Sequence, residues 1–203
     1  AYTAKWEDIE VSLGRPEFET LFSHIRMIYR RARPRESILK EFREYVVRPA
    51  RDAQQVIDDA IVPYGTAQHT IRHAAYTHTR GAESVNLPLY WLNAVADADW
   101  LPAAMVALVE HRREPELLAR FLRDLERLAA GQMILRASAT ARAGRYGRVL
   151  ALLDQSRASY APVFADDSPL QLTTSERADI LRILGSNLDI HNTHVRRFVL
   201  LRL

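Results

Sequence analysis

The chain has 203 residues, of which 48% are hydrophobic, so it is long enough to bury a real core and is too apolar for an intrinsically disordered protein. It has no cysteine, which excludes disulfides, thiolate zinc sites and thiol catalysis, and no apolar run approaches the ~20 residues needed to span a bilayer. The formal net charge is only +3, which argues against a surface that binds polyanions all over, although nearly all of the 28 basic residues are arginine and local patches are still expected. We expect a cytoplasmic protein without a membrane segment.

Helical periodicity dominates the first part of the chain. Trp6, Ile9 and Leu13 recur at three- and four-residue steps and predict a short helix that ends at "GRP", after which Pro16 suits the first turn of a second helix. The apolar positions of "EFETLFSHIRMIYRRA" follow the helical period closely and predict an amphipathic helix. After "RARPR", the spacing predicts one helix up to Pro49 and another over residues 50–62 that ends at "PYG".

The second part of the chain also lacks strand signals. Residues 64–82 are the least periodic and predict a loop with short helical turns, whereas Asp99 and Pro102 predict the cap and first turn of a helix in "LPAAMVALVEHRR". The strongest amphipathic pattern is "EPELLARFLRDLERLAAGQMILRA", and Thr173 with Glu176 predicts a capping box. We therefore predict an all-α fold, an irregular bundle of roughly eight to ten helices in a single domain over residues 1–203, with a hinge near residues 138–147. The final helix is expected to start near residue 192.

Histidines provide two candidate metal sites. His69, His73 and His78 include a four-residue step that places two rings on one helix face, but the segment lacks the glutamate of an "HExxH" motif, so a structural or surface role is favoured. His191 and His194 follow Asp189, but they straddle an expected helix start, which fixes their geometry poorly. We predict no metal site, and no catalytic residues, in this chain.

Two arginine clusters are the candidate nucleic-acid contacts. The first lies at the end of one helix and in the following turn and consists of Arg26, Arg30, Arg31, Arg33 and Arg35, of which the last three are the candidate contacts. The second surrounds the glycine-containing hinge and consists of Arg136, Arg142, Arg145 and Arg148. Guanidinium groups suit phosphate geometry, and the glycines would let backbone approach a ligand. The alternative is that these arginines complement helix C-terminal dipoles and keep the surface soluble.

The order of these segments resembles the helical middle region of GmrSD-type restriction and anti-phage proteins. The resemblance rests on "W-x-x-I" followed by "FETLFSHIRMIYRRARPRESILKEFREY", then "WLPAAMVALVEHRREPELLARFLRDLERL", "ILRASATARAGRYGRVLALL" and "NTHVRRFVLLRL", in that order. Proteins of this family have an N-terminal ParB/sulfiredoxin-like nucleotide-hydrolysing domain and a C-terminal HNH nuclease. The "DGQQR"-like and "EHILP"-like motifs of those domains are absent here, so the resemblance carries over no catalytic residue.

The resemblance implies a helical connector or sensor domain of a DNA-targeting defence protein. The chain does not begin with Met and both ends read as cuts, so we expect a piece of a longer protein whose nucleotide and divalent metal belong to the flanking domains and whose partners are DNA and those domains. The parent would be an NTPase and an HNH nickase. An alternative is a structural or homodimerising helical domain without DNA contact, in which exposed aromatics such as Trp91 and Trp100 serve an interface. A third reading, a small-molecule enzyme on a helix bundle, would need a pocket with converging polar groups, of which the sequence gives no sign.

Overall fold

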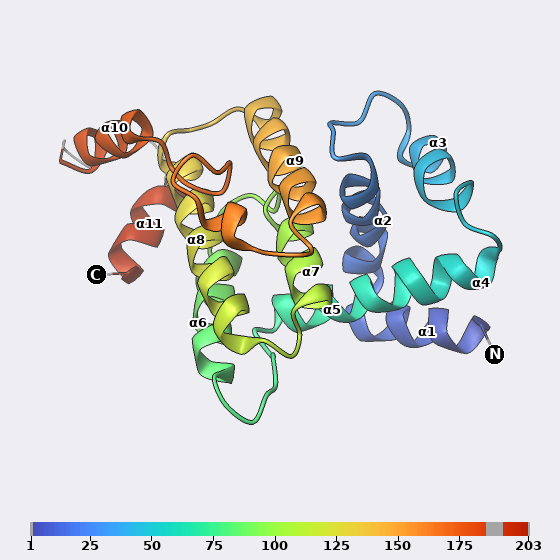
Figure 1. The fold of residues 1–203 in the computed structure, drawn as a ribbon. Coiled ribbons are helices and arrows are strands. Elements are labelled where there is room, and N and C mark those ends of the chain that lie inside the picture. Colours follow the sequence, from blue (N-terminus) through green and yellow to red (C-terminus); the bar gives the residue numbers. More distant parts are fainter. Residues whose placement is uncertain (1, 186–192, 203) are drawn as a thin grey trace.

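The computed structural model describes residues 2–185 and 193–202, and these residues are all-helical, without a β-strand (Figure 1). Helix α3 continues into a π-helical turn, η1, and α4, η2 and α5 form one continuous helix. Counted in this way, and without the short 3₁₀ helix η3, the described residues make ten helices. The predicted all-α fold is confirmed. The elements in chain order are α1 (Tyr2–Leu13), α2 (Arg15–Arg30), α3 (Ile38–Phe42), η1 (Arg43–Val47), α4 (Ala53–Val56), η2 (Ile57–Ile61), α5 (Val62–Arg72), α6 (Ala82–Asn93), α7 (Leu101–Glu110), α8 (Pro115–Ile134), α9 (Ala139–Gln155), η3 (Ala161–Phe164), α10 (Thr174–Gly185) and α11 (Thr193–Arg202).

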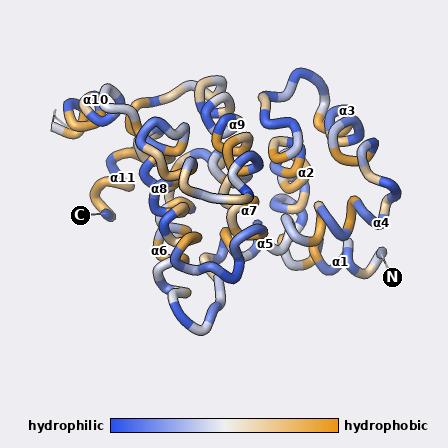
Figure 2. Tube along the Cα trace, in the orientation of Figure 1, coloured by the Kyte–Doolittle hydropathy of each residue, from blue (hydrophilic) through white to orange (hydrophobic). Residues whose placement is uncertain are grey.

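The two helices with the clearest sequence pattern form as predicted. In α2, Phe18, Leu21, Ile25 and Ile28 are buried along one face, and Pro16 occupies the first turn, where its missing N–H leaves no hydrogen bond unmade. In α8 the apolar stripe is buried in the same way, and apolar and polar residues alternate along both helices (Figure 2). Burial of one stripe stabilises each helix far more than intrinsic propensity does.

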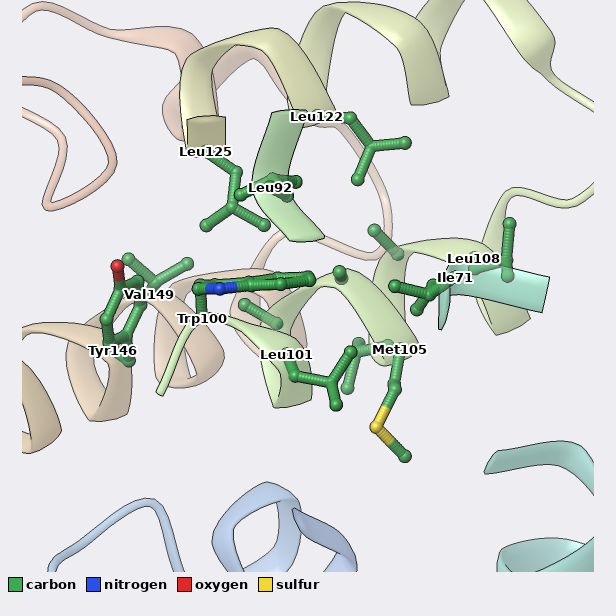
Figure 3. Packing of buried hydrophobic residues seen from close by; sticks show 14 of the residues in the cluster. Ile71, Leu92, Trp100, Leu101, Met105, Leu108, Leu122, Leu125, Tyr146 and Val149 are labelled. Carbon is green, nitrogen blue, oxygen red and sulfur yellow. The ribbon is translucent and has the colours of Figure 1, made fainter. Parts of the chain in front are cut away.

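The centre of the core is built around Trp100, which is 1% exposed. Its ring lies between Leu92 and Leu125 on one side and Leu101 on the other (Figure 3). The indole Nε1 donates a hydrogen bond of 2.8 Å to the carbonyl oxygen of Asp97, so its polar atom is satisfied. The expectation that Trp100 is an exposed interface residue is therefore wrong, because Trp100 is the side chain on which α6, α7 and α8 meet.

The other aromatic named for an interface, Trp91, is half-buried. Its ring packs edge-on against Phe198 at 6.0 Å between centroids, and the guanidinium of Arg202 lies 4.8 Å from its centroid. These contacts fasten α11 to α6. Trp91 therefore already has an intramolecular partner on the side that faces α11.

One predicted helix end is wrong, and so is the start of the loop predicted after it. Residues 53–72 form one continuous helix through "PYG", because a wide π-helical turn, η2, precedes Pro63 and because Gly65 packs directly against Ile9 of α1. A β-carbon at position 65 would overlap the Ile9 side chain, so close packing explains this glycine. The loop predicted over 64–82 is consequently confined to residues 73–81.

The predicted hinge near 138–147 is also wrong, since α9 is one unbroken helix from Ala139 to Gln155. The chain turns just before it, and Ser138 caps α9 by accepting a hydrogen bond of 3.2 Å from the N–H of Ala141. Gly144 and Gly147 lie within the helix.

The predicted caps have mixed outcomes. Asp99 does not cap α7, whose N-cap is Trp100, and its carboxylate instead accepts from Arg142. The capping box before α10 is confirmed: the Thr173 N–H donates to Glu176 Oε2 at 2.8 Å, and the Glu176 N–H donates to Thr173 Oγ1 at 3.1 Å.

The last helix, α11, starts at Thr193, close to the expected position. The candidate metal residues Asp189 and His191, and the side chain of His194, lie outside the described residues. Among the helices that are described, none combines the length and apolar character needed to cross a membrane.

Candidate nucleic-acid interface and the adjoining polar cleft

The segments that carry the two predicted arginine clusters pack against each other in the structure. Helices α2 and α9 lie side by side (Figure 1), and the turn that follows α2 runs along α9. The Arg31 guanidinium donates to Asp154 at 2.7 Å, and the Arg33 guanidinium donates to the hydroxyl of Thr140. We call this contact line, defined by Arg31, Arg33, Thr140, Gly147 and Asp154, the α2–α9 seam.

Gly147 makes the close approach of the seam possible. A β-carbon at this position would overlap the carbonyl oxygen of Arg31. Arg31 ends α2 in the left-handed region, with φ of 58°, and its N–H donates to the Met27 carbonyl at 2.8 Å. The glycine of the expected hinge therefore accommodates a neighbouring helix end and not an external ligand.

Three of the predicted nucleic-acid contacts are engaged inside the protein: Arg31, which pairs with Asp154, and Arg142 and Arg145. The Arg142 Nε donates to Asp99 at 2.6 Å and lies 3.4 Å from Asp97, while its Nη1 donates to the Ala137 carbonyl at 2.7 Å. Although burial alone would lower the pKa of Arg142, its hydrogen bond to Asp99 and the charges of both aspartates raise it. This guanidinium fastens α9 to the start of α7.

Arg145 fastens the connection between η3 and α10. Its guanidinium donates to the carbonyl oxygens of Pro169 and Gln171 and lies 3.4 Å from Glu176, and only 12% of its side chain is exposed. Because the donors of Arg145 are already used within the chain, it has few left for a phosphate.

The remaining predicted arginines face solvent. Arg35, Arg136 and Arg148 are exposed, and within the described residues their side chains have no ion-pair or hydrogen-bond partner. Arg33 is exposed as well, although it donates to Thr140 across the seam. These four form the part of the two clusters that a phosphate backbone could reach.

Beneath the seam lies a buried charged cluster that the sequence alone did not predict. The Glu41 carboxylate accepts from Arg26 Nη1 at 2.8 Å and from Arg30 Nη1, and it also accepts the backbone N–H groups of Arg35 and Glu36 at 2.8 and 3.0 Å. Arg26 is 4% exposed and Glu41 is 2% exposed. Two guanidinium charges thus face one carboxylate in a nearly dry environment, and the excess positive charge lies under the turn that carries Arg33 and Arg35.

A cleft of about 310 Å³ opens beside the seam, between α2 and the first turns of α7 and α9, and we call it the polar cleft after the charged and polar groups that interrupt its largely apolar lining. Its chemistry comes from Ser23, His24, Arg26, Arg33 and Asp99, and Ala143 leaves room on the α9 side. This converging set could not be predicted from the sequence, because its members are far apart along the chain. Its volume is at the lower end of the range for small-molecule pockets.

His24 is held in one orientation within the cleft. The amide nitrogen of Gln68 donates to the carbonyl oxygen and to Oε2 of Glu17, at 2.9 and 2.8 Å, so the amide oxygen of Gln68 faces His24 Nδ1 at 3.0 Å. The Nδ1 atom therefore carries the proton. Burial lowers the pKa of His24, against the opposing effect of the Gln68 hydrogen bond, so the ring is neutral at physiological pH. Its Nε2 is then a lone-pair acceptor.

His69, His73 and His78 contact backbone carbonyl oxygens or one another. His69 and His73 lie with ring centroids 4.3 Å apart, and His73 Nδ1 bonds to the carbonyl oxygen of His69, while His78 Nδ1 bonds to that of Arg80. No group of three potential metal ligands occurs in the described part of the chain. The structural role favoured for these histidines fits their backbone contacts.

Comparisons of the chain with protein-family models, with curated proteins and with solved structures found no match.

Proposed function

We propose that this chain is a helical connector or sensor domain that contacts DNA backbone through the exposed arginines of the two clusters. The observation that supports the proposal is that the turn carrying the first arginine cluster packs against α9, which carries Arg142, Arg145 and Arg148 of the second cluster more than 100 residues away in sequence. The resemblance to the GmrSD-type helical middle region supplies the larger setting. There the domain would relay between a nucleotide-hydrolysing domain and an HNH nuclease, and nucleotide and divalent metal would belong to those domains.

The contact would be made by Arg33, Arg35, Arg136 and Arg148, which are exposed, and not by Arg142 or Arg145. Exposed guanidiniums bind phosphates without reading sequence, and binding of this kind releases counterions and weakens steeply with salt. The excess charge of the buried Arg26–Arg30–Glu41 cluster would add to the positive potential at the same place.

The test is binding of a fluorescent duplex by the protein at several salt concentrations. Replacing Arg136 and Arg148 by alanine is expected to weaken binding about tenfold or more and to lower the salt slope by about 2. The matched control replaces Arg80 and Arg113, which are also exposed but lie in loops at the other end of the molecule (Figure 1). Equal losses in both double variants would mean that net charge alone drives binding, and the seam would have no special role.

A second candidate function is a protein-interaction domain without DNA contact, which is favoured by an apolar groove of about 820 Å³. Trp6, Phe18, Phe22 and Phe42 meet there edge-to-face, and Leu39 on its rim is 80% exposed. Sedimentation of the protein over a range of concentrations discriminates the two. A tight dimer with no affinity for duplex DNA supports the interaction domain, whereas a monomer that binds DNA with salt dependence supports the connector.

A further inference from the structure

We infer that the polar cleft beside the α2–α9 seam binds a small oxyanion, a phosphate monoester or a carboxylate, that also carries a hydroxyl or amino donor. The inference does not depend on the proposed DNA contact: of the four arginines assigned to that contact only Arg33 lines the cleft, and the other groups of the cleft lie inside the protein. It rests on three properties of the cleft: its basic wall, its oriented acceptor and its open volume.

The basic wall selects an anion. Arg26 is almost completely buried, and its positive charge is only partly compensated, since Glu41 is shared between Arg26 and Arg30. Its Nη1 donates to Glu41 and to the Ala32 carbonyl oxygen at 3.0 Å, its buried Nε has no hydrogen-bond partner among the described residues, and Nη2 makes a long contact of 3.9 Å with the sulfur of Met27. Arg33 adds a second guanidinium at the edge of the cleft. Guanidinium groups bind phosphate and carboxylate oxygens with two parallel hydrogen bonds, which makes an oxyanion the matching ligand.

The first turns of two helices add to this preference. Ala139 and Ala143 of α9 and Pro102 of α7 line the cleft, so it lies at the N-terminal ends of both helices. The partial positive charge of a helix N-terminus favours an anion nearby. Asp99 on the same side does not cancel the preference, because its carboxylate is already bonded to Arg142 at 2.6 Å.

His24 requires a hydrogen-bond donor on the ligand. Its Nδ1–H is committed to Gln68, and Gln68 is in turn fixed by Glu17, to which Arg72 also donates at 3.2 Å. No described residue donates to His24 Nε2, and the ring lines the cleft. A neutral imidazole held in this way offers one lone pair, so a ligand hydroxyl or amino group would complete its hydrogen bonding. Because guanidinium groups and a lone-pair acceptor line the same small cleft, we infer a ligand that carries both an anionic group and a hydrogen-bond donor, and not a bare ion.

The direct test is a titration of the protein with glycerol 3-phosphate, followed by the imidazole Cε1–H resonance of His24 and by the melting temperature at constant ionic strength. We expect saturable binding with a Kd of about 1 mM or lower, and the two readouts are expected to agree. Malate in place of glycerol 3-phosphate tests whether a carboxylate is preferred to a phosphate. Glycerol and inorganic phosphate each supply half of the chemistry, so both are expected to bind more weakly.

Two matched pairs of variants locate the site. Arg33→Ala is expected to weaken binding about tenfold or more, while Arg35→Ala, two residues along the same exposed turn, leaves it unchanged, because Arg35 does not line the cleft. Ala143→Leu fills the cleft and is expected to abolish binding, while Ala141→Leu on the exposed side of α9 does not. All four positions are outside the fully buried core, so the variants are expected to fold.

The inference is overturned by any of three results. The first is no saturable change with either glycerol 3-phosphate or malate. The second is a change that sodium chloride reproduces at equal ionic strength. The third is binding that survives both Arg33→Ala and Ala143→Leu, which would place the ligand elsewhere. Loss of duplex binding in the Arg136 and Arg148 variant, with ligand binding intact, would separate the cleft from the DNA proposal.

Discussion

Replacing Glu41 by glutamine is expected to cost the protein about 3 kcal/mol of stability near neutral pH. The side chain is 2% exposed and faces the guanidiniums of Arg26 and Arg30. Burial by itself would raise the pKa of Glu41, but hydrogen bonds from the Arg35 and Glu36 backbone and from the two guanidiniums outweigh it and lower the pKa from 4.5 to about 2. A shift of this size corresponds to about 3 kcal/mol in favour of the charged carboxylate, and breaking a buried ion pair costs about 3–5 kcal/mol in general.

The assay is urea denaturation of the wild type and of Glu41→Gln, with Glu19→Gln as the control. Glu19 is also on the N-terminal half of the molecule and pairs with Arg15, but both side chains are largely exposed, at 66% and 86%. Its replacement is expected to cost less than about 1 kcal/mol. Glutamine keeps the size of the glutamate side chain, so the difference between the two variants reports the buried charge.

The pH dependence provides a second check on the same residue. Because the pKa of Glu41 is depressed in the folded state, its contribution to stability is fully present above the unfolded pKa of about 4.5 and is lost as the pH falls toward about 2. Glu41→Gln has no such group, so the gap between wild type and variant should narrow over this window. A variant within about 1 kcal/mol of the wild type at neutral pH, or a gap that stays constant on acidification, would refute the reasoning.

Two further predictions concern helix packing and capping. Gly147→Ala is expected to destabilise the protein by about 1–3 kcal/mol because its β-carbon meets the Arg31 carbonyl. Gly144→Ala, one turn earlier and in looser surroundings, should be neutral or stabilising by up to about 1 kcal/mol. Thermal melts of the two variants compare these effects. An equal effect at both glycines would show that the missing β-carbon of Gly147 does not explain the close approach at the seam. Thr173→Ala is expected to cost about 1 kcal/mol and to speed amide hydrogen exchange in the first turn of α10, and unchanged exchange there would show that the capping box contributes little.

The parts of the fold that could be predicted from the sequence are those in which one helix carries its own signal. The stripe of α2 and that of α8 each specify a buried face without reference to the rest of the chain. The helix through residues 53–72 does not, because proline and glycine are ordinarily read as stops. Gly65 continues a helix here only because Ile9, 56 residues earlier, packs against it, and local propensity contains no information about that contact.

The candidate site could likewise be predicted only where the signal is local in the sequence. The sequence identified the arginines by type and clustering, but it could not distinguish an exposed guanidinium from one that fastens the fold. That distinction is set by partners at long range: Asp99 is 43 residues from Arg142, and Asp154 is 123 residues from Arg31. His24 was not singled out for the same reason, since Gln68, which orients it, is 44 residues away. Within α2 itself the local signal was one histidine in an amphipathic helix. Such a histidine is more often a packed core residue than a ligand-binding one.

Some of the predicted arginines are paired inside the protein and others are exposed, so the salt dependence of DNA affinity reports how many of them contact DNA. A guanidinium whose donors are used internally does not neutralise a phosphate without breaking its own bonds, so Arg142 and Arg145 contribute little to counterion release. If only the four exposed arginines of the two clusters contact duplex DNA, the logarithm of affinity should fall with the logarithm of salt with a slope of about −4 or shallower. A slope nearer −6 would require the internal pairs to open on binding. Because Arg142 joins α9 to the start of α7, such an opening would release two helices from one another, and DNA contact would then be coupled to a rearrangement of the bundle.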